Sequence, residues 1–361
     1  MKKLTINTEV LKPALKRLSQ AVAKKPVLPA LSNIYLRAQP GKVEMITTDL
    51  ELTISYLFSC ECQDEFEMLI PFDVLHDSVN IMLVQPIEIQ LHSKNKASIV
   101  SMDGPLHLGT LDKVAEYPKI PDIPKKNSIE LDDKVMEWLG RAMASTSQDE
   151  LRPAMMKALL EIEPTGINIV STNAHTLFRH KFPRELEHKE QILISPKIAK
   201  ALEGFASAQV TWHAKHVALK SGDITVIATR SEDKFPNYKV VIPNHEANLS
   251  VSRNLLLLAL NRATVINKGR ISLRLDPAVD SSFTVIAADD DLQRKQEVSV
   301  HGSYTGKATE IFFSPELFKR MLHQIDFDQI ALHLDGPIRG ALISSEDDAE
   351  YLGMIMPLVN Q

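Results

Sequence analysis

The chain has 361 residues, a length typical of two or three domains. Its content of 44% apolar and 24% charged residues is ordinary for globular proteins and excludes disordered, collagen-like and disulfide-scaffold classes. The net charge of −5 argues against a protein that grips DNA through many phosphate contacts, although it leaves room for a local basic face. Residues 1–7 lack the apolar core of a signal peptide, and the longest apolar run, at residues 255–260, is far too short to span a bilayer. We therefore expect a cytoplasmic protein without membrane contact.

The sequence contains an internal repeat with a period of roughly 120 residues, longer than the periods of solenoid proteins. Residues 28–36 resemble residues 152–160, and residues 43–49 resemble residues 167–173 at the same offset of 124. Two ungapped matches in one register indicate that one structural unit occurs more than once.

Helical periodicity follows the same repeat. Apolar residues at positions i, i+3, i+4 and i+7 predict two amphipathic helices in each of three repeats. Their apolar faces are Leu11, Ala14, Leu15 and Leu18; Phe72, Leu75 and Val79; Val135, Trp138, Leu139 and Ala142; Ile198, Ala201, Leu202 and Phe205; Leu256, Ala259, Leu260 and Ala263; and Phe318, Met321, Leu322 and Ile325. Residues 208–212, 217–220 and 224–228 alternate in the way that strands do. The fold class is therefore α+β, with two helices packed on antiparallel sheet in each repeat.

Similar phrases close the first two repeats, at residues 117–121 and 235–243, and a polar connector follows each of them. These connectors are the natural places for domain boundaries. We expect three domains, at residues 1–124, 125–246 and 247–361.

The chain has no recognisable catalytic motif. It lacks both glycine-rich phosphate-binding patterns and the elbow that presents a nucleophilic serine. Cys60 and Cys62 are one residue apart on an expected strand, so their side chains point to opposite faces and predict neither a disulfide nor a shared metal. We expect a protein that is not an enzyme and that needs no cofactor.

Three groups of residues contain side chains that could bind a metal ion. The pairs His213 with His216, and His175 with His180, have no third ligand at a recognisable spacing. The run at residues 289–291, all aspartate, is more typical of an acidic turn. We therefore expect no metal site.

Basic side chains are concentrated on the predicted helices. Lys12 and Lys16 share one helix face, and Lys197 and Lys200 lie on a later helix. A solvated surface accounts for any one of these helices. Six helices of a near-symmetric repeat that point to one centre would instead form a basic lining, which contacts phosphates without reading bases.

The whole chain resembles the bacterial DNA polymerase III beta subunit, the beta sliding clamp. Residues 25–33, KPVLPALSN, are similar to the family phrase R-P-T-L-P-I-L-x-N. Residues 235–243, FPNYKVVIP, are similar to F-P-x-Y-x-x-v-i-P, and residues 355–358, IMPL, to the closing M-P-[ML]. The order and spacing of these phrases over three repeats carry the resemblance.

The resemblance implies the DNA clamp fold, in which the three domains form half of a closed ring and two chains join head to tail. It implies that the ring encircles duplex DNA without sequence specificity. It also implies a non-catalytic subunit that tethers the replicative polymerase and so raises its effective concentration at the primer end. The implied partners are a second copy of the chain, double-stranded DNA, the DNA polymerase III catalytic subunit, an ATP-driven clamp loader and other clamp-motif replication and repair proteins.

The resemblance further implies three functional surfaces. The partner-peptide pocket between the second and third domains comprises Met155, Thr172, His175, Leu177, Pro236, Val240, Val241, Leu317, Ile355, Met356, Pro357 and Leu358. The DNA-facing residues are Lys25, Gln148 and Arg152 by resemblance, together with Lys12, Lys16, Lys197 and Lys200 of the basic helix faces. The ring junction joins Leu106 and Leu108 of one chain to Val265 and Ile266 of the other.

The sequence departs from the family phrase T-D-G-H-R-L, which stands here as residues 172–177, TNAHTL. Ala174 in place of glycine restricts the backbone if φ is positive there. Thr176 in place of arginine removes a charge from the pocket rim. An extra clamp copy with altered partner preference is therefore one alternative. A direct double-stranded DNA-binding protein and an enzyme with scattered catalytic residues are the others.

Overall fold

The computed structural model describes residues 1–93, 96–110, 114–122, 127–279, 281–289 and 291–359. The chain divides into two compact units. Unit 1 comprises Met1–Met136 and Lys197–Arg230, and unit 2 comprises Glu137–Pro196 and Ser231–Gln361. The predicted boundary between residues 124 and 125 lies outside the described residues.

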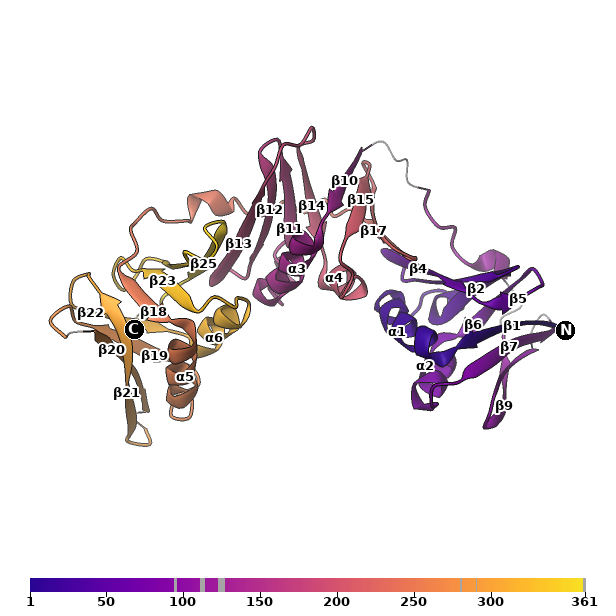
Figure 1. The fold of residues 1–361 in the computed structure, drawn as a ribbon, viewed down its shortest axis with the longest axis horizontal. Helices are drawn as coiled ribbons and strands as arrows, with labels where there is room; N and C mark the ends of the chain where they lie inside the picture. Colours follow the sequence, from indigo (N-terminus) through magenta and orange to yellow (C-terminus); the bar gives the residue numbers. More distant parts are fainter. Residues whose placement is uncertain (94–95, 111–113, 123–126, 280, 290, 360–361) are drawn as a thin grey trace. The chain divides into compact units, whose positions relative to one another are not determined.

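The α-helices of the described residues lie where the apolar periodicity predicts them (Figure 1). They are α1 (Thr8–Leu18), α2 (Phe72–Ile81), α3 (Asp133–Ala142), α4 (Pro196–Ala201), α5 (Arg253–Ala263) and α6 (Pro315–His323).

Two helices are shorter than the sequence predicts. The periodicity extends the fourth helix to Phe205, but α4 ends at Ala201, and Gly204 has a φ of +80°, a conformation that glycine favours after a helix. The sixth helix was expected to include Ile325, but α6 ends at His323. Both residues still contribute to packing, because Ile325 is buried and the ring of Phe205 lies under an arginine of α1.

Unit 1 contains two antiparallel sheets. The five-stranded sheet has the order β5 (Glu61–Cys62), β1 (Lys2–Asn7), β7 (Pro86–Ser93), β8 (Lys96–Ser101) and β9 (Gly104–Gly109). The eight-stranded sheet has the order β10 (Asn127–Leu131), β15 (Ala208–Trp212), β16 (His216–Ser221), β17 (Ile224–Thr229), β4 (Leu52–Ser59), β3 (Lys42–Thr48), β2 (Asn33–Gln39) and β6 (Phe66–Pro71). The pairing of β4 with β17 joins the first repeat to the middle repeat in one continuous sheet.

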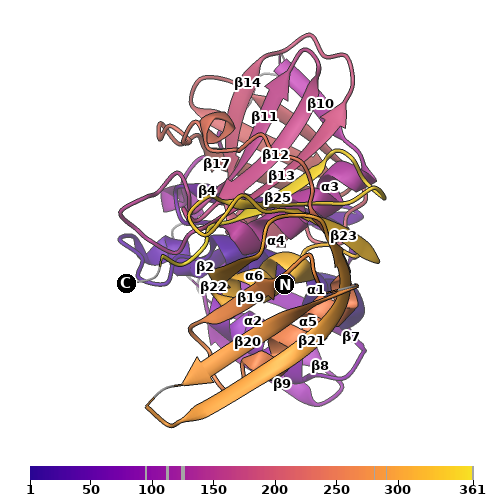
Figure 2. The ribbon, with the colours of Figure 1, turned by 90° about the vertical axis from the view of Figure 1, so that its left-hand side faces the viewer.

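Unit 2 is built on one twelve-stranded sheet. Its order is β14 (Glu190–Ile194), β11 (Ala158–Glu163), β12 (Gly166–Thr172), β13 (Thr176–Pro183), β25 (Tyr351–Ile355), β24 (Ala341–Ser344), β23 (Gln329–His333), β18 (Leu249–Ser252), β21 (Arg294–Tyr304), β20 (Ser282–Asp289), β19 (Ile271–Leu275) and β22 (Thr309–Phe313). Figure 2 shows the long hairpin of β20 and β21 in orange. The pairing of β13 with β25 joins the middle repeat to the third repeat.

The helices bury the apolar faces that the sequence predicts. Leu11, Leu15 and Leu18 of α1 are inaccessible to solvent, as are Phe318 and Leu322 of α6. Burial of one such side chain contributes about 1.5–3 kcal/mol relative to leaving it exposed. The amphipathic faces therefore hold the helices on the sheets.

The repeat seen in the sequence also occurs in the hydrogen bonding. Thr47 Oγ1 donates to the carbonyl oxygen of Leu18 at 2.8 Å, and Ser171 Oγ donates to that of Ala142 at 2.6 Å. Donor and acceptor are each shifted by 124 residues from one contact to the other. The same helix end is therefore tied to the same strand in both copies.

Candidate functional site

An apolar cluster in unit 2 includes two of the predicted pocket residues, Leu177 and Met356. The register of β13 places Leu177 opposite Met354 of β25, and that of β24 places Leu342 opposite the same methionine. Leu177 and Met354 are 1% and 5% exposed, whereas Met356 is half-buried and packs against them. The cluster thus extends from the core to the surface.

The segment after residue 231 covers one side of this cluster. Tyr238 is buried in the cluster, and Phe235 and Ile242 pack against it. Val240 and Val241 are 74% and 53% exposed. Two aliphatic side chains therefore stand in solvent beside an apolar floor, which is the arrangement that an apolar peptide anchor needs.

The two methionines of the cluster lie beside a glycine. A Cβ added at Gly340 would lie 2.9 Å from the Sδ of Met354 and 3.2 Å from that of Met356. The thioethers therefore approach the backbone more closely than another residue would allow. Methionine side chains adapt to differently shaped partners.

A buried carboxylate fixes the position of this segment. Tyr238 donates to Glu161 Oε2 at 2.7 Å, and Lys239 Nζ lies 3.2 Å from the same oxygen. Asn168 and Gln191 each donate to the carboxylate at 3.1 Å. Hydrogen bonds to a charged group typically contribute about 1.5–3 kcal/mol, so this network anchors the backbone that carries Val240.

The hairpin between β12 and β13 forms another edge of the site. The backbone N–H of Met356 donates to the carbonyl oxygen of His175 at 2.8 Å. Asn173 Oδ1 accepts from the N–H groups of His175 and Thr176, and Thr172 Oγ1 accepts from that of Ala174. Ala174 has a φ of +73°, so the glycine of the family phrase is missing at a position where glycine is preferred.

The remaining predicted pocket residues occupy different places. Ile355 and Pro357 are buried, Pro236 is exposed, and Leu358 is half-buried with its N–H bonded to the carbonyl oxygen of Phe312 at 2.7 Å. Met155 is buried and Leu317 half-buried, and neither belongs to the cluster around Leu177 and Met354.

Two predicted DNA-facing lysines lie together in unit 1. Lys16 and Lys200 are exposed and line a small hollow of about 130 Å³ with Pro13, Arg17 and Glu203. This hollow places a lysine of α1 beside one of α4.

Two other lysines have partners within unit 1. Lys12 Nζ donates to the carbonyl oxygen of Met82, just after α2, and Lys197 Nζ lies 2.8 Å from Asp49 Oδ2. The ammonium group of each lysine therefore already has a partner in the same chain.

The other predicted DNA-facing residues lie in exposed segments. Lys25, Gln148 and Arg152 are all exposed, and Arg152 Nε lies 3.5 Å from Asp149 Oδ2. An exposed ion pair of this kind contributes little to stability.

The predicted ring-junction residues are accessible. Leu106 and Leu108 are half-buried on β9, which is an edge strand of its sheet. Val265 is 79% exposed just after α5, and Ile266 is half-buried.

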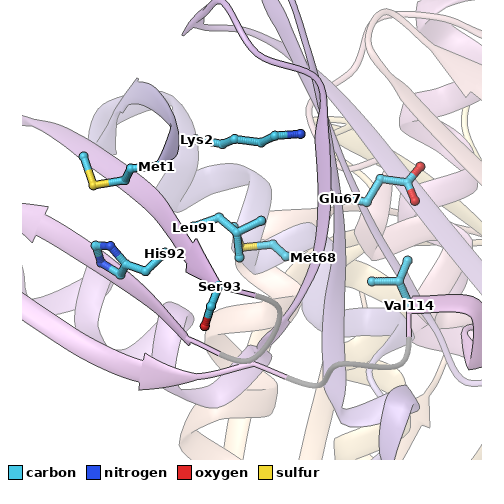
Figure 3. Close-up of a pocket in the computed structure, with 8 residues that line it drawn as sticks. All are labelled: Met1, Lys2, Glu67, Met68, Leu91, His92, Ser93 and Val114. Atoms are coloured by element: carbon cyan, nitrogen blue, oxygen red, sulfur yellow. The ribbon is translucent and has the colours of Figure 1, made fainter.

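A pocket of about 480 Å³ in unit 1 was not predicted (Figure 3). Its lining combines apolar side chains with charged ones, from β1 and the residue before it, from β6 and β7, and from the short 3-10 helix at residues 114–116. The lining residues are Met1, Lys2, Glu67, Met68, Leu91, His92, Ser93 and Val114. No sequence motif marks it, because its residues come from four separate segments.

The predicted metal candidates are the next feature. Among the described residues, no group of three or more histidine, cysteine, aspartate or glutamate side chains is placed to hold a metal ion. The rings of His213 and His216 are 5.2 Å apart, and both cysteines are free. Asp289 accepts from the N–H of Leu292, as in a turn, and Asp290 lies outside the described residues.

No helix in the described part of the chain is long and apolar enough to cross a membrane.

The comparison with protein families agrees with this architecture. The family model for the N-terminal domain of the DNA polymerase III beta subunit matches residues 2–121, and the model for the C-terminal domain of that subunit matches residues 239–359. The chain belongs to the DNA polymerase III beta subunit family. The family match and the clamp fold support its function as a processivity sliding clamp of DNA polymerase III.

Similar proteins cover the full length of this family member. The beta sliding clamp of Pseudomonas putida is 26% identical over 98% of this chain and 99% of the relative, and that of Synechococcus elongatus is 23% identical over 99% of each. The crystal structure of the DNA polymerase III beta subunit from Thermotoga maritima superposes with a TM-score of 0.90 at 21% identity, over 100% of both chains. A sliding clamp from Pseudomonas aeruginosa bound to griselimycin gives a TM-score of 0.91 at 21% identity, over 99% of this chain and 100% of that one. The predicted DNA clamp fold is confirmed, and the alternative of an extra clamp copy is not favoured.

Proposed function

We propose that two copies of this chain close a ring around duplex DNA and that partners dock on the apolar cluster of unit 2. The family match supports the ring, and the observation that carries the docking site is the exposure of Val240 and Val241 beside the cluster that contains Leu177 and Met354. The site accepts short linear peptides with apolar anchors, since its floor is apolar and its methionines adapt to different anchors. The proposed partners are the DNA polymerase III catalytic subunit, the clamp loader and other clamp-motif proteins.

The rest of the predicted pocket surrounds this floor in our proposal. Thr172 and His175 form the hairpin edge, and Met356 lies between that hairpin and the floor. Pro236, Ile355, Pro357 and Leu358 complete the site, and Met155 and Leu317 form its outer wall. The chain acts as a non-catalytic subunit that changes where a polymerase is, not what it does.

Three domains, at residues 1–124, 125–246 and 247–361, make up half of the proposed ring. The two family matches, at residues 2–121 and 239–359, support this division. Leu106 and Leu108 on the edge strand β9 form one side of the junction, and Val265 and Ile266 form the other.

The proposed DNA contact uses phosphates alone. Lys16 and Lys200, with Lys12, Lys25, Gln148, Arg152 and Lys197, face the duplex. Retention by the ring does not require tight binding, which is consistent with the net charge of −5. Few phosphate contacts also let the ring slide, since each contact adds salt-dependent affinity.

A fluorescent peptide carrying a polymerase-type clamp motif tests the pocket. We expect saturable binding to the wild-type chain and at least tenfold weaker binding to Met356→Asp, because a charge in an apolar site costs several kcal/mol. Val279→Asp, at another exposed aliphatic position of unit 2, is the matched control and should bind as the wild type does. Equal binding by Met356→Asp, or none by a folded wild-type chain, contradicts the proposed pocket.

A further inference from the structure

The first helix of every repeat has arginine as its penultimate residue. Arg17 precedes the last residue of α1, Arg141 that of α3, and Arg262 that of α5. A guanidinium group carries five N–H donors and is always charged. It is therefore suited to the unpaired carbonyl oxygens at the C-terminus of another helix.

Arg17 makes this contact in unit 1. Its Nη1 donates to the carbonyl oxygens of Ala201 at 2.9 Å and Glu203 at 2.7 Å. Because α4 ends at Ala201, these are carbonyls that the helix itself leaves unpaired. The guanidinium also lies 4.6 Å from the ring centre of Phe205. Arg17 thus ties the first helix of one repeat to the second helix of the next.

Arg141 makes the equivalent contact in unit 2. Its Nη1 donates to the carbonyl oxygen of Gln324 at 3.2 Å, and the guanidinium makes two bonds of 3.0 Å to the carboxylate of Asp326. Gln324 is the C-cap residue of α6, and its side chain donates back to the carbonyl oxygen of Arg141 at 3.0 Å. The arginine again joins the first helix of one repeat to the second helix of the following repeat.

The third arginine has no such neighbour among the described residues of its own chain. Within the part of the chain that the structure describes, Arg262 is exposed and has neither a hydrogen-bond nor an ion-pair partner for its side chain. Arg17 joins α1 to α4 and Arg141 joins α3 to α6, so α5 and α2, the second helix of the first repeat, are the helices that this pattern leaves unmatched among those described. One donor is therefore left over, together with the last turn of α2, since the carbonyl oxygens of Met82 and Leu83 just after it accept from Lys12 and Thr8 of the same chain.

The C-terminus of α2 is also unusually apolar. The helix ends at Ile81, which is 86% exposed, and Leu83 is 83% exposed. These neighbouring side chains form an exposed apolar patch, which in a soluble protein marks an interaction surface. Val265, three residues after Arg262, is exposed to a similar degree. An exposed aliphatic side chain therefore lies close in sequence to Arg262, as Ile81 does at the C-terminus of α2.

We infer that Arg262 of one chain donates to the carbonyl oxygens of the last turn of α2 in a second copy. In this contact Ile81 and Leu83 of the second copy pack against Val265 and Ile266. The inference rests on the proposed ring and deepens it, because it assigns a residue that orients the junction. In a twofold ring the contact occurs twice. Every joint of the ring then contains its own helix-capping arginine.

The dissociation constant of the dimer tests this contact. By sedimentation at decreasing concentration, Arg262→Ala should raise the constant about 100-fold, tenfold for each of the two junctions. The matched control is Arg320→Ala, since Arg320 Nη2 binds Glu316 of its own helix at 2.8 Å, and its constant should equal that of the wild type. Arg17→Ala should lower thermal stability without changing the dissociation constant, because its contact lies within one chain.

Covalent capture tests the geometry separately. In a Cys60→Ser, Cys62→Ser background, Arg262→Cys with Ile81→Cys should give chains joined by a short bismaleimide. Lys220→Cys with Ile81→Cys should not. A wild-type chain that stays monomeric at micromolar concentration overturns the proposed ring. A wild-type dimer whose constant is unchanged by Arg262→Ala, or in which this change weakens only DNA binding, overturns the inference and leaves the ring standing.

Discussion

Leu50 and Ala174, which are 124 residues apart, occupy the same position in two copies of one hairpin turn. Their φ angles are +77° and +73°. In each turn the backbone N–H of this residue donates to the threonine hydroxyl two residues earlier. The distance is 3.1 Å from Leu50 to Thr48 and 3.2 Å from Ala174 to Thr172. The sequence repeat is therefore also a repeat of backbone conformation, including a conformation that neither leucine nor alanine favours.

Ala174→Gly should stabilise the chain. Glycine adopts a positive φ without the steric cost that alanine has, and this gain exceeds the added entropy of the unfolded chain. We expect the free energy of unfolding to rise by roughly 0.5–1 kcal/mol in urea denaturation. Ala199→Gly, inside α4, should instead lower it by about 1 kcal/mol. A loss of stability in Ala174→Gly would show that the methyl group is needed for packing.

Glu161→Gln should make the stability depend less on pH. Burial raises the pKa of the Glu161 carboxyl, but the hydrogen bonds from Tyr238 and Gln191 and the charge of Lys239 outweigh it, so that the pKa lies below its ordinary value. The carboxylate therefore stabilises the fold above a pH of about 4.3, and this contribution is lost as the pH falls through the lowered pKa.

The melting temperatures of both proteins, measured from neutral pH downward, check this prediction. Glu161→Gln should melt well below the wild type at neutral pH, and the difference should narrow below a pH of about 4. Glu163 is the more exposed of the two carboxylates that pair with Lys239. Glu163→Gln is therefore the control and should change the melting temperature less than Glu161→Gln does. A difference that stays constant into acid would exclude a stabilising role for the ionised form.

Lys12 and Lys16 should have different functions although they share a helix face. Lys12→Ala removes the donor to the carbonyl oxygen of Met82, so it should lower stability by about 1 kcal/mol and weaken DNA binding less than Lys16→Ala does. Lys16→Ala removes an exposed charge, so it should reduce the slope of log affinity against log salt by about 0.9. Melting curves and DNA titrations at several salt concentrations check both. Equal salt slopes for Lys16→Ala and the wild type would remove Lys16 from the DNA-facing set.

Val265→Asp combined with Ile266→Asp should give monomers. The changes place two charges in the proposed apolar seam against Leu106 and Leu108, where they cannot be solvated. Native mass spectrometry should show one chain in place of two. A control with Val279→Asp should remain dimeric. An unchanged dimer mass in the double variant would remove these residues from the junction.

The sequence was sufficient to predict the helices, because they depend on local periodicity, whereas the peptide-binding role of the apolar cluster stays a prediction. Motifs with fixed spacing pointed to Leu177, Met356 and the segment with Val240, and in the structure Leu177, Met356 and Tyr238 of that segment pack in one apolar cluster. The lengths of α4 and α6 were not predictable, because Gly204 and the cap at Gln324 override the apolar pattern beyond Ala201 and His323. These local terminators are stronger than a weak hydrophobic periodicity.

Contacts between distant segments could not be predicted from one sequence. The buried network of Glu161 and Tyr238 joins residues 77 positions apart, and no motif links them. The capping role of Arg17 depends on which carbonyls lie 2.7–2.9 Å away, and only coordinates give that. The three penultimate arginines stand in the sequence, but their common function could be recognised only from the contacts that Arg17 and Arg141 make in the structure.

The most direct test of the clamp function is retention on circular DNA. A clamp loader would place the labelled chain on nicked circular plasmid, and the bound fraction would be measured by gel filtration in high salt before and after linearisation. We expect the protein to stay on the circle and to leave the linear product, because the ring is held by topology. Equal release from circular and linear DNA, with a steep dependence on salt, would identify a direct DNA binder and contradict the sliding clamp.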